Sequence, residues 1–464
     1  MMKNYIKSLF ELDYTKYPYI IIFIIVFLLS RIPFLNLGFG NDPDAWRIAN
    51  SAFDLNHYLI YHTSRFPGYP LPEFVNSLVI NYGWLATNSL TMIITLISVL
   101  VFAKILKELE VENKGLIVIT FAFLPIVWIN SVNTMDYMWA VTFIIISWYF
   151  VIKKRHLIAG LMIGLAIASR PTSAILLIPF IYLIISQNNN KDGLKFLILS
   201  LITSFLLFLP LIFQYGLGFI SFYLTAMDVN SIINDFLSYF GFLAALVFIL
   251  ILISSGKKAY QTIKNDANLI FAIVEIFLVM ILFAISPYET AYLLPAIPFT
   301  LYLLSKISNK KLFNLLCILL ILNSFVSVNL TLESSELIDK GIVFSDANQR
   351  VILTSALEKI TSSNINNSII ITGEFFPILS YFANNSSKVL QQNNKEIDPK
   401  PKNGVCWDAK RNITYVYIAY PEEIKEWQNK GYKIYFAGPP AYATTKLNFN
   451  YDLREHNITN ILNQ

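Results

Sequence analysis

The stretch YIIIFIIVFLLSRIPFLNLGFGNDPDAWR, residues 19–47, sets the class of this chain. It begins with an apolar run long enough to cross a bilayer, which takes about 20 residues in a helix. It ends with Asp42 and Asp44, where the apolar character stops. No small-residue cleavage site follows the run. The segment before it is too long and too mixed in composition for the start of a signal sequence. We therefore expect residues 18–37 to form a first transmembrane helix that the protein retains.

The whole chain is apolar. Of its 464 residues, 55% are hydrophobic and 14% are charged, and its mean hydropathy is +0.55. A soluble domain carries about a quarter charged residues, so the expected fold class is a polytopic α-helical membrane protein. The proline after Arg170 favours a break between the fifth and sixth of eleven expected spans. The expected spans are residues 18–37, 86–106, 115–132, 134–152, 157–169, 171–187, 194–213, 235–254, 268–286, 291–306 and 311–330.

The basic residues have a one-sided pattern. With the N-terminus placed inside the cell, seventeen of them fall in inner segments, and the outer segments before residue 331 hold four arginines. This positive-inside pattern predicts a cytoplasmic N-terminus and an extracytoplasmic C-terminal region in a plasma (inner) membrane protein. Because the basic residues follow the topology, the net charge of +5 does not indicate nucleic-acid binding. The inner set is Lys3, Lys7, Lys16, Lys104, Lys107, Lys114, Lys153, Lys154, Arg155, Lys191, Lys195, Lys257, Lys258, Lys264, Lys306, Lys310 and Lys311, and the outer set is Arg31, Arg47, Arg65 and Arg170.

Acidic residues gather on the same outer side as the four arginines. Polar loops explain any single one of these acids. The close pair Asp42 and Asp44 beside Trp46 and Arg47 instead favours an active surface at the outer membrane boundary. The outer acids are Asp42, Asp44, Asp54, Asp136, Asp228 and Glu289.

The first outer loop, residues 38–85, carries two motifs. The apolar positions of DAWRIANSAFDL, residues 44–55, suit a short amphipathic helix on the membrane surface. The prolines and glycine of HTSRFPGYPLPE, residues 62–73, predict a rigid, non-helical path. Arg65 would be fixed in that path, where its planar fork suits a phosphate. The alternative is a pairing of Arg65 with Glu73 or with one of the aspartates.

Further candidates follow along the chain. Asn133 or Thr134 could cap a helix whose first turn holds Asp136. Gly160 and Gly164 predict close helix packing, and Arg170 is a second candidate anion contact.

The turn ISPYETAYLLPAIP, residues 285–298, would project Tyr288, Glu289 and Tyr292 at the outer interface. Aromatic residues are also common at membrane interfaces for structural reasons. Glu275 is an ionisable residue within a span and hence a functional candidate, but it lies nearer the inner side.

Residues 334–464 change abruptly to a polar composition. NSIIITG, ITYVYIAY and YKIYFAG are typical of strands, and PEEIKEWQNKG of a helix. We expect a small extracytoplasmic α/β domain after a transmembrane domain of residues 1–333. It has no glycine-rich nucleotide motif. Cys317 and Cys406 belong to different regions, so no disulfide is expected.

The set of motifs, in this order, resembles the GT-C superfamily of polytopic glycosyltransferases. The branch it resembles most holds the protein O-mannosyltransferases and the lipid A aminoarabinose transferases. The resemblance rests on the acidic first-loop motif, FPGYPLPE, NTMDYMWA, the GLMIGLAIASRP helix and the late Tyr-x-x-x-Tyr-Leu-Leu-Pro turn. VCWDAK at 405–410 departs from the WWDxG motif of oligosaccharyltransferases, so transfer of a whole glycan to asparagine is disfavoured.

The resemblance implies a catalytic aspartate, and it matches Asp44, since Arg47 and Ala49 follow at the family's spacing. The family's next residue is Glu where this chain has Ala45, which leaves Asp42 as the alternative. The aspartate that the family carries after the third helix matches Asp136.

The resemblance also implies a sugar donor linked to a polyprenyl phosphate and an outer acceptor hydroxyl on a glycan, lipid or protein. The leaving phosphate needs positive charge, and the acceptor needs a base. Direct attack would invert the anomeric centre. The candidate substrate-binding residues are Arg65, Arg170, Arg47, Tyr69, His62, Tyr288, Glu289 and Tyr292.

No cofactor is required by this scheme, and no HExxH or CxxC motif occurs in the chain. His57 and His62, near Asp42, Asp44 and Asp54, could hold a divalent cation. A second class is a transporter or flippase of lipid-linked glycans. It would need ionisable groups near the bilayer midplane, and Glu275 is the one such residue that we find in the sequence. A non-catalytic scaffold would not need acids and arginines on one face.

Overall fold

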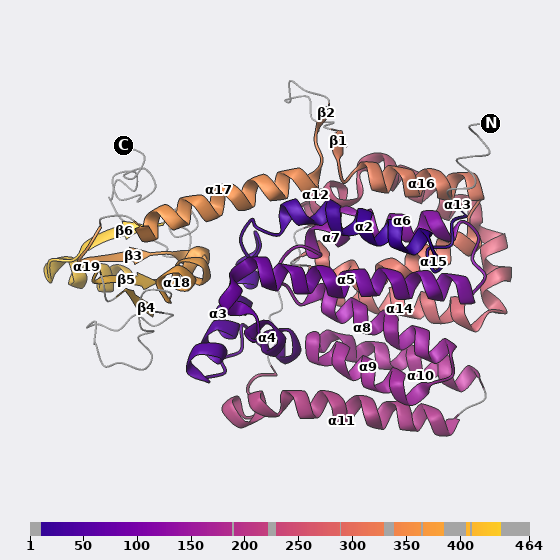
Figure 1. Ribbon diagram of the computed structural model, residues 1–464, viewed down its shortest axis with the longest axis horizontal. Coiled ribbons are helices and arrows are strands. Elements are labelled where there is room, and N and C mark those ends of the chain that lie inside the picture. Colours follow the sequence, from indigo (N-terminus) through magenta and orange to yellow (C-terminus); the bar gives the residue numbers. More distant parts are fainter. Residues whose placement is uncertain are drawn as a thin grey trace.

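The computed structural model describes residues 11–187, 190–220, 229–287, 289–328, 338–362, 365–384, 405–408 and 411–437. These residues form a large helical part and, beyond it in the chain, a sheet covered by helices (Figure 1). The expected mainly helical fold is therefore confirmed.

The helical part begins with α2 and ends with α16 (Figure 1). Its helices are α2 (Tyr19–Arg31), η1 (Ile32–Phe34), α3 (Pro43–Tyr58), α4 (Pro70–Ser77), η2 (Ile80–Tyr82), α5 (Gly83–Glu108), α6 (Lys114–Phe123), α7 (Pro125–Asn130), α8 (Tyr137–Ile152), α9 (His156–Ser169), η3 (Pro171–Leu176), α10 (Leu177–Ser186), α11 (Asn190–Tyr215), α12 (Val229–Phe240), α13 (Phe242–Lys264), α14 (Ala267–Ile285), η4 (Thr290–Ala296), α15 (Ile297–Ile307) and α16 (Lys310–Leu322).

All eleven expected spans are helical over much of their length, but eleven full-length helices are not found. Within the described part of the chain, four helices are long and apolar enough to cross a membrane: Ile80–Glu108, Asn190–Tyr215, Ala267–Ile285 and Thr290–Ile307. The other apolar helices are shorter, among them Tyr19–Phe34 and Tyr137–Ile152.

Three of the expected spans have wrong boundaries, each for a local reason. The third breaks into α6 and α7 because Pro125 cannot donate a backbone hydrogen bond within a helix. The span expected over 235–254 starts later, because Gly241 at φ 82° separates α12 from α13. The last ends at Leu322 instead of residue 330, because the chain turns into a strand at Val326.

The first outer loop contains the expected amphipathic helix, α3, which buries Trp46, Ile48, Ala49 and Phe53 on one side. The expectation of a wholly non-helical path over 62–73 is wrong in its second half. The helix α4 begins at Pro70, where proline at the first helical position costs nothing because that amide has no partner in a helix.

Gly160 and Gly164 bring α9 against α11, as their spacing predicts. A Cβ atom added to Gly160 would lie 2.6 Å from the backbone oxygen of Phe196, and one on Gly164 would lie 2.6 Å from the Cβ of Thr203. Only glycine permits this approach of the two backbones.

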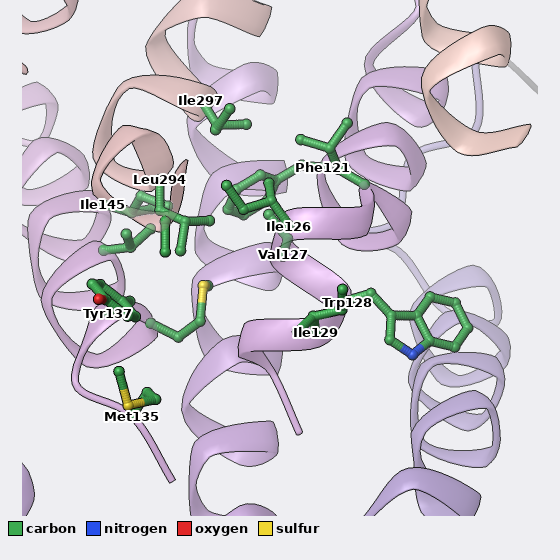
Figure 2. Packing of buried hydrophobic residues seen from close by; sticks show 14 of the residues in the cluster. Phe121, Ile126, Val127, Trp128, Ile129, Met135, Tyr137, Ile145, Leu294 and Ile297 are labelled. Carbon is green, nitrogen blue, oxygen red and sulfur yellow. The ribbon is translucent and has the colours of Figure 1, made fainter. Parts of the chain in front are cut away.

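Buried apolar side chains join the short helix α7 to its neighbours (Figure 2). Ile126 and Val127 of α7 share this cluster with Ile145 of α8 and Leu294 of η4. This packing holds the segment before Asp136 and the segment after Glu289 against each other.

The C-terminal part forms a four-stranded sheet of order β4-β5-β3-β6, with β5, β3 and β6 parallel and β4 antiparallel to β5. A strand lies within each of the segments predicted as strands at 367–373, 413–420 and 432–438, and a helix lies within the segment predicted as a helix at 421–431. The elements are β1 (Val326–Val328), β2 (Ile338–Lys340), α17 (Ile342–Ser362), β3 (Ser368–Ile371), η5 (Gly373–Phe375), α18 (Phe376–Asn384), β4 (Val405–Asp408), β5 (Ile413–Val416), α19 (Pro421–Asn429) and β6 (Lys433–Phe436).

The long helix α17 runs from the sheet onto the helical part (Figure 1). Its Arg350 is buried and donates to the backbone oxygens of Gly38 and Val132 at 2.8 and 3.1 Å. Asn50 of α3 donates to the backbone oxygen of Pro377 at 2.7 Å. The C-terminal part is thus attached directly to the loop that carries the acidic pair. Among the described residues, Cys317 in α16 and Cys406 in β4 form no disulfide.

Replacing Gly160 by alanine should destabilise the protein by about 1–3 kcal/mol, because the added methyl group would meet the Phe196 backbone. Unfolding of the purified protein in mixed micelles measures this loss. Gly193→Ala, on α11 itself, is the matched control, since the nearest atom to its new methyl group would be 3.6 Å away. Equal stability of the two variants would show that the glycine contact does not hold α9 and α11 together.

Candidate active site

The acidic pair lies at the start of α3. Asp42 is the N-cap: its backbone is extended and its Oδ1 accepts a hydrogen bond of 2.8 Å from the Asp44 amide. Pro43 occupies the first helical position, which suits its fixed φ. This local geometry places the two carboxyl groups side by side at the positive end of the helix dipole.

Asp44 begins a row of alternating charges. Its Oδ1 lies 2.5 Å from Nη1 of Arg47, and its Oδ2 lies 2.8 Å from Nε of Arg65. The second nitrogen of Arg65, Nη2, lies 2.7 Å from Oδ1 of Asp136, and Nη1 of Arg170 lies 2.7 Å from Oδ2 of the same aspartate. Arg65 therefore pairs with two aspartates and not with Glu73.

Glu73 instead holds the loop that carries Arg65. It is fully buried, its Oε1 accepts a hydrogen bond of 2.7 Å from the Ser64 amide, and its other oxygen accepts from the hydroxyl of Tyr61. The ring of Tyr69 lies 3.9 Å below the guanidinium carbon of Arg65. In the described part of the chain, Nη1 of Arg65 is buried and has no hydrogen-bond partner, so this nitrogen is available to an anion.

Aromatic rings also surround Arg170. Its guanidinium carbon lies 4.3 Å from the ring centre of Tyr137 and 4.5 Å from that of Tyr292. Such rings attract a cation through their electron-rich faces. They hold the guanidinium in place without neutralising its charge, so Arg170 keeps its attraction for an anion.

The pKa values of the Asp42 and Asp44 carboxyl groups are shifted in opposite directions. Burial would raise the pKa of Asp44, but the charges of Arg65 and Arg47 outweigh it and hold that pKa below its usual range. Burial and the nearby negative charge of Asp44 raise the pKa of Asp42. Burial and the charge of Asp42 raise the pKa of Glu289 well above its usual range. The raised pKa of Glu289 favours its protonated form, which can donate a hydrogen bond to Asp42, and the lowered pKa of Asp44 favours its ionised form.

A cavity of about 1440 Å³ opens beside these groups. Its polar end is lined by Asp42, Asp44, Arg65, Arg170 and Glu289. Its apolar wall comes from η3, from α14 and from the turn after Arg65, and its outer rim comes from the C-terminal part. The apolar lining includes Phe66, Pro67, Pro171, Ile175, Leu176, Val279, Leu282, Ile285 and Pro295, and the rim includes Glu374 and Tyr417.

A divalent cation could be held by Asp42, Asp44 and Glu289, whose carboxylate oxygens lie within 4.8 Å of one another. Oxygen ligands of this kind suit magnesium or calcium. Glu289 would have to lose its proton to bind. This group of carboxylates contains neither His57 nor His62. His57 stacks on Phe53 at 3.9 Å and His62 lies 3.3 Å from Gln214, so a cation held by these histidines stays an untested prediction.

Most of the residues predicted from the sequence meet at this cavity. Arg47, Tyr69 and Tyr292 line it beside the five groups named above. Asp136 is fully buried behind Arg65 and Arg170 and is not among the lining residues, so it positions the arginines. The expected cap of α8 by Asn133 or Thr134, with Asp136 in the first turn, is wrong. The helix starts at Tyr137, and Asp136 is the N-cap residue and makes no side-chain cap bond.

Other candidates lie apart from the cavity or outside the described residues. His62 does not line the cavity. Tyr288 and Asp228 fall outside the described residues. Sequence reasoning missed Glu374 and Tyr417 at the rim, and Tyr137, whose hydroxyl donates to Glu289. It named Glu73 only as a possible partner of Arg65 and not as a support of the Arg65 loop. Glu374 directly follows the predicted strand NSIIITG, which is a signal that could have indicated the rim.

The site thus brings two arginines and three carboxyl groups together at a cavity that is also lined by many apolar residues. Two solved structures of ArnT from Cupriavidus metallidurans are similar to this chain. The apo structure aligns with a TM-score of 0.44 and 12% identity, over 75% of this chain and 64% of that one. The structure bound to undecaprenyl phosphate aligns with a TM-score of 0.44 and 13% identity, over 79% and 69%. No protein-family model and no curated protein matches the chain.

Asp136→Asn should cost about 3–5 kcal/mol of stability, because it leaves the largely buried Arg65 and the buried Arg170 without their shared counter-charge. Denaturant titration in mixed micelles gives the free energy of unfolding. Glu426→Gln is the control: it removes an exposed pair with Lys430, worth less than about 1 kcal/mol. A loss for Asp136→Asn no larger than the control's would mean that the arginines do not depend on Asp136.

Proposed function

We propose that the protein is an integral-membrane glycosyltransferase that moves a hexosyl or pentosyl group from a polyprenyl phosphate to an extracytoplasmic acceptor hydroxyl. One observation carries the proposal: the largely buried Arg65 and the buried Arg170 converge at the polar end of a large cavity that is elsewhere lined by many apolar residues. A ligand that fits has an anionic head and an apolar chain. The family resemblance of the first-loop, FPGYPLPE and late-turn motifs supports the same donor.

The arginines would bind the phosphate of the donor. When the bond from the anomeric carbon to the phosphate oxygen breaks, that oxygen takes the electron pair and the phosphate gains a second negative charge. Nη1 of Arg65 and the guanidinium of Arg170 can stabilise this charge without a proton transfer. Asp136 keeps both guanidiniums in place during the reaction.

Asp44 would be the base that takes the proton of the acceptor hydroxyl as its oxygen attacks the anomeric carbon. In the free protein Arg65 and Arg47 hold Asp44 ionised but weakly basic. A phosphate that binds Arg65 competes with Asp44 for that cation and so raises the basicity of the carboxylate. The base would therefore be active only with a donor in the cavity. Asp42 is the alternative base, and attack on the face opposite the phosphate inverts the anomeric centre.

The reaction would take place at the outer face of the plasma membrane. The positive-inside pattern supports a cytoplasmic N-terminus, with the acidic pair and the C-terminal part outside. In this scheme the donor reaches the cavity from the bilayer and the acceptor reaches it from the aqueous side, past Glu374 and Tyr417. The scheme needs no cofactor, since the arginines neutralise the phosphate.

A transporter of lipid-linked glycans is the second candidate, and Glu275 is the observation that favours it. Glu275 is fully buried in α14, and within the described residues neither of its carboxyl oxygens has a hydrogen-bond partner. Such residues mark ion or substrate paths in many transporters. A protein that moves labelled donor across a vesicle membrane without consuming it would support this candidate.

Asp44→Asn should lower sugar transfer by at least about a hundredfold while donor binding persists, since it removes the base and keeps the shape. The assay supplies purified protein in lipid with undecaprenyl-phosphate mannose, glucose, galactose or arabinose, each radiolabelled, and with membrane extract as acceptor. Asp42→Asn is run in parallel. A larger loss of sugar transfer in Asp42→Asn than in Asp44→Asn would assign the role of base to Asp42. If the folded protein consumes none of the donors, the proposed function is contradicted.

The acid limb of the pH profile should lie at higher pH for kcat than for kcat/KM of the donor. The profile of kcat/KM reports the free protein, in which arginines hold the pKa of Asp44 low, and kcat reports the donor complex, in which the phosphate shares Arg65. Activity should fall as the pH drops through each limb, because the base becomes protonated. Coinciding limbs would contradict the competition between the phosphate and Asp44.

A further inference from the structure

We infer that Glu374 and Tyr417 form an acceptor subsite that favours neutral or cationic groups bearing hydrogen-bond donors, and that Arg47 couples this subsite to Asp44. The inference rests on the proposed function and extends it from the donor to the acceptor. Both residues belong to the C-terminal part, which the chemistry of phosphate and base does not otherwise use.

The position of the two residues in the sheet supports the subsite. Glu374 follows the carboxyl end of β3. Tyr417 follows the carboxyl end of the neighbouring parallel strand β5, directly after Val416, which pairs with Ile371 of β3. From β3 the chain leads to α18, which packs on one face of the sheet, and from β5 it leads to α19 on the other. Adjacent parallel strands whose connections leave to opposite faces form a crevice where ligands commonly bind.

Local hydrogen bonds fix the crevice. The Gly373 amide donates to the backbone oxygen of Tyr417 at 3.0 Å, and the Thr372 amide donates to that of Val416 at 2.9 Å. Gly373 has a φ of 53°, a conformation that glycine adopts without strain, and the turn it makes leads into Glu374. The Tyr417 hydroxyl donates to Oε1 of Glu374 at 2.8 Å. The carboxylate is therefore held in one orientation at the cavity rim.

Arg47 connects the rim to the base. Its Nη1 contacts Asp44 at 2.5 Å, and its Nη2 lies 3.6 Å from Oε2 of Glu374. The Glu374 side chain is 47% exposed, so Oε2 can also accept hydrogen bonds from a ligand in the cavity. An acceptor hydroxyl or ammonium bound there would lie one guanidinium away from Asp44. A carboxylate on the acceptor would be repelled by Glu374.

Three methyl glycosides test the charge preference: methyl glucoside, methyl glucosaminide and methyl glucuronide, which differ in one neutral, cationic or anionic group. Each is offered with a labelled donor that the protein consumes, and the sugar transferred to the glycoside and to water is counted. The wild type should favour the glucosaminide over the glucuronide about tenfold. Glu374→Gln should remove most of that preference, measured as the ratio of the two glycoside products.

Two further variants complete the test. Glu422→Gln makes the same change on the exposed first turn of α19 and should keep the preference. Tyr417→Phe releases the carboxylate without removing its charge and should weaken the preference less than Glu374→Gln does. Donor consumption with no preference, or with a preference that Glu374→Gln leaves unchanged, overturns the subsite alone. No consumption of donor by the wild type overturns the proposed function and the subsite with it.

Discussion

The buried carboxylate of Asp136 between two guanidiniums is the interaction on which the site depends. Arg65 comes from the first outer loop and Arg170 from the turn between α9 and η3, and each gives one hydrogen bond of 2.7 Å to the same aspartate. Two cations at this depth would repel each other and lose hydration without a shared anion. Asp136 supplies that shared anion. Arg65 and Arg170 both also line the cavity.

From this interaction the rest of the site follows. Arg65 is long enough to reach Asp44 as well, which fixes the start of α3 against the membrane helices. Asp44 in turn holds Arg47, and Arg47 approaches Glu374 of the C-terminal part. A single row of alternating charges thus runs from Arg170 and Asp136 through Arg65, Asp44 and Arg47 to Glu374. A change of charge at either end is expected to alter the proton affinity of the carboxylate in the middle.

The sequence was most informative where local rules decide the structure. Local rules of helix capping, small-residue spacing and turn chemistry predict three features that the structure contains. They are the helix after Pro43, the close packing at Gly160 and the helix after Tyr420. The prediction that the acids and arginines of the outer segments share one face also placed Asp42, Asp44, Arg65, Arg170 and Glu289 together. Helix ends were predicted less well, because Pro125 and Gly241 interrupt runs whose composition remains apolar.

Pairings between distant segments could not be predicted. Arg65 and Asp136 are 71 residues apart, and nothing in the local sequence distinguishes Asp136 from Asp44 as the partner. The arrival of Glu374 at the cavity depends on how the sheet docks on α3 through Asn50 and Arg350, which is a property of tertiary packing.

The central claim is that the Arg65–Asp136–Arg170 cluster binds the phosphate of a lipid. The most direct test compares the affinity of the purified protein for undecaprenyl phosphate with its affinity for undecaprenol, which has the same chain and no phosphate. We expect the phosphate to strengthen binding at least about tenfold in the wild type, and the Arg65→Met, Arg170→Met double variant to bind both lipids equally. Equal affinity of the wild type for the two lipids would contradict the account.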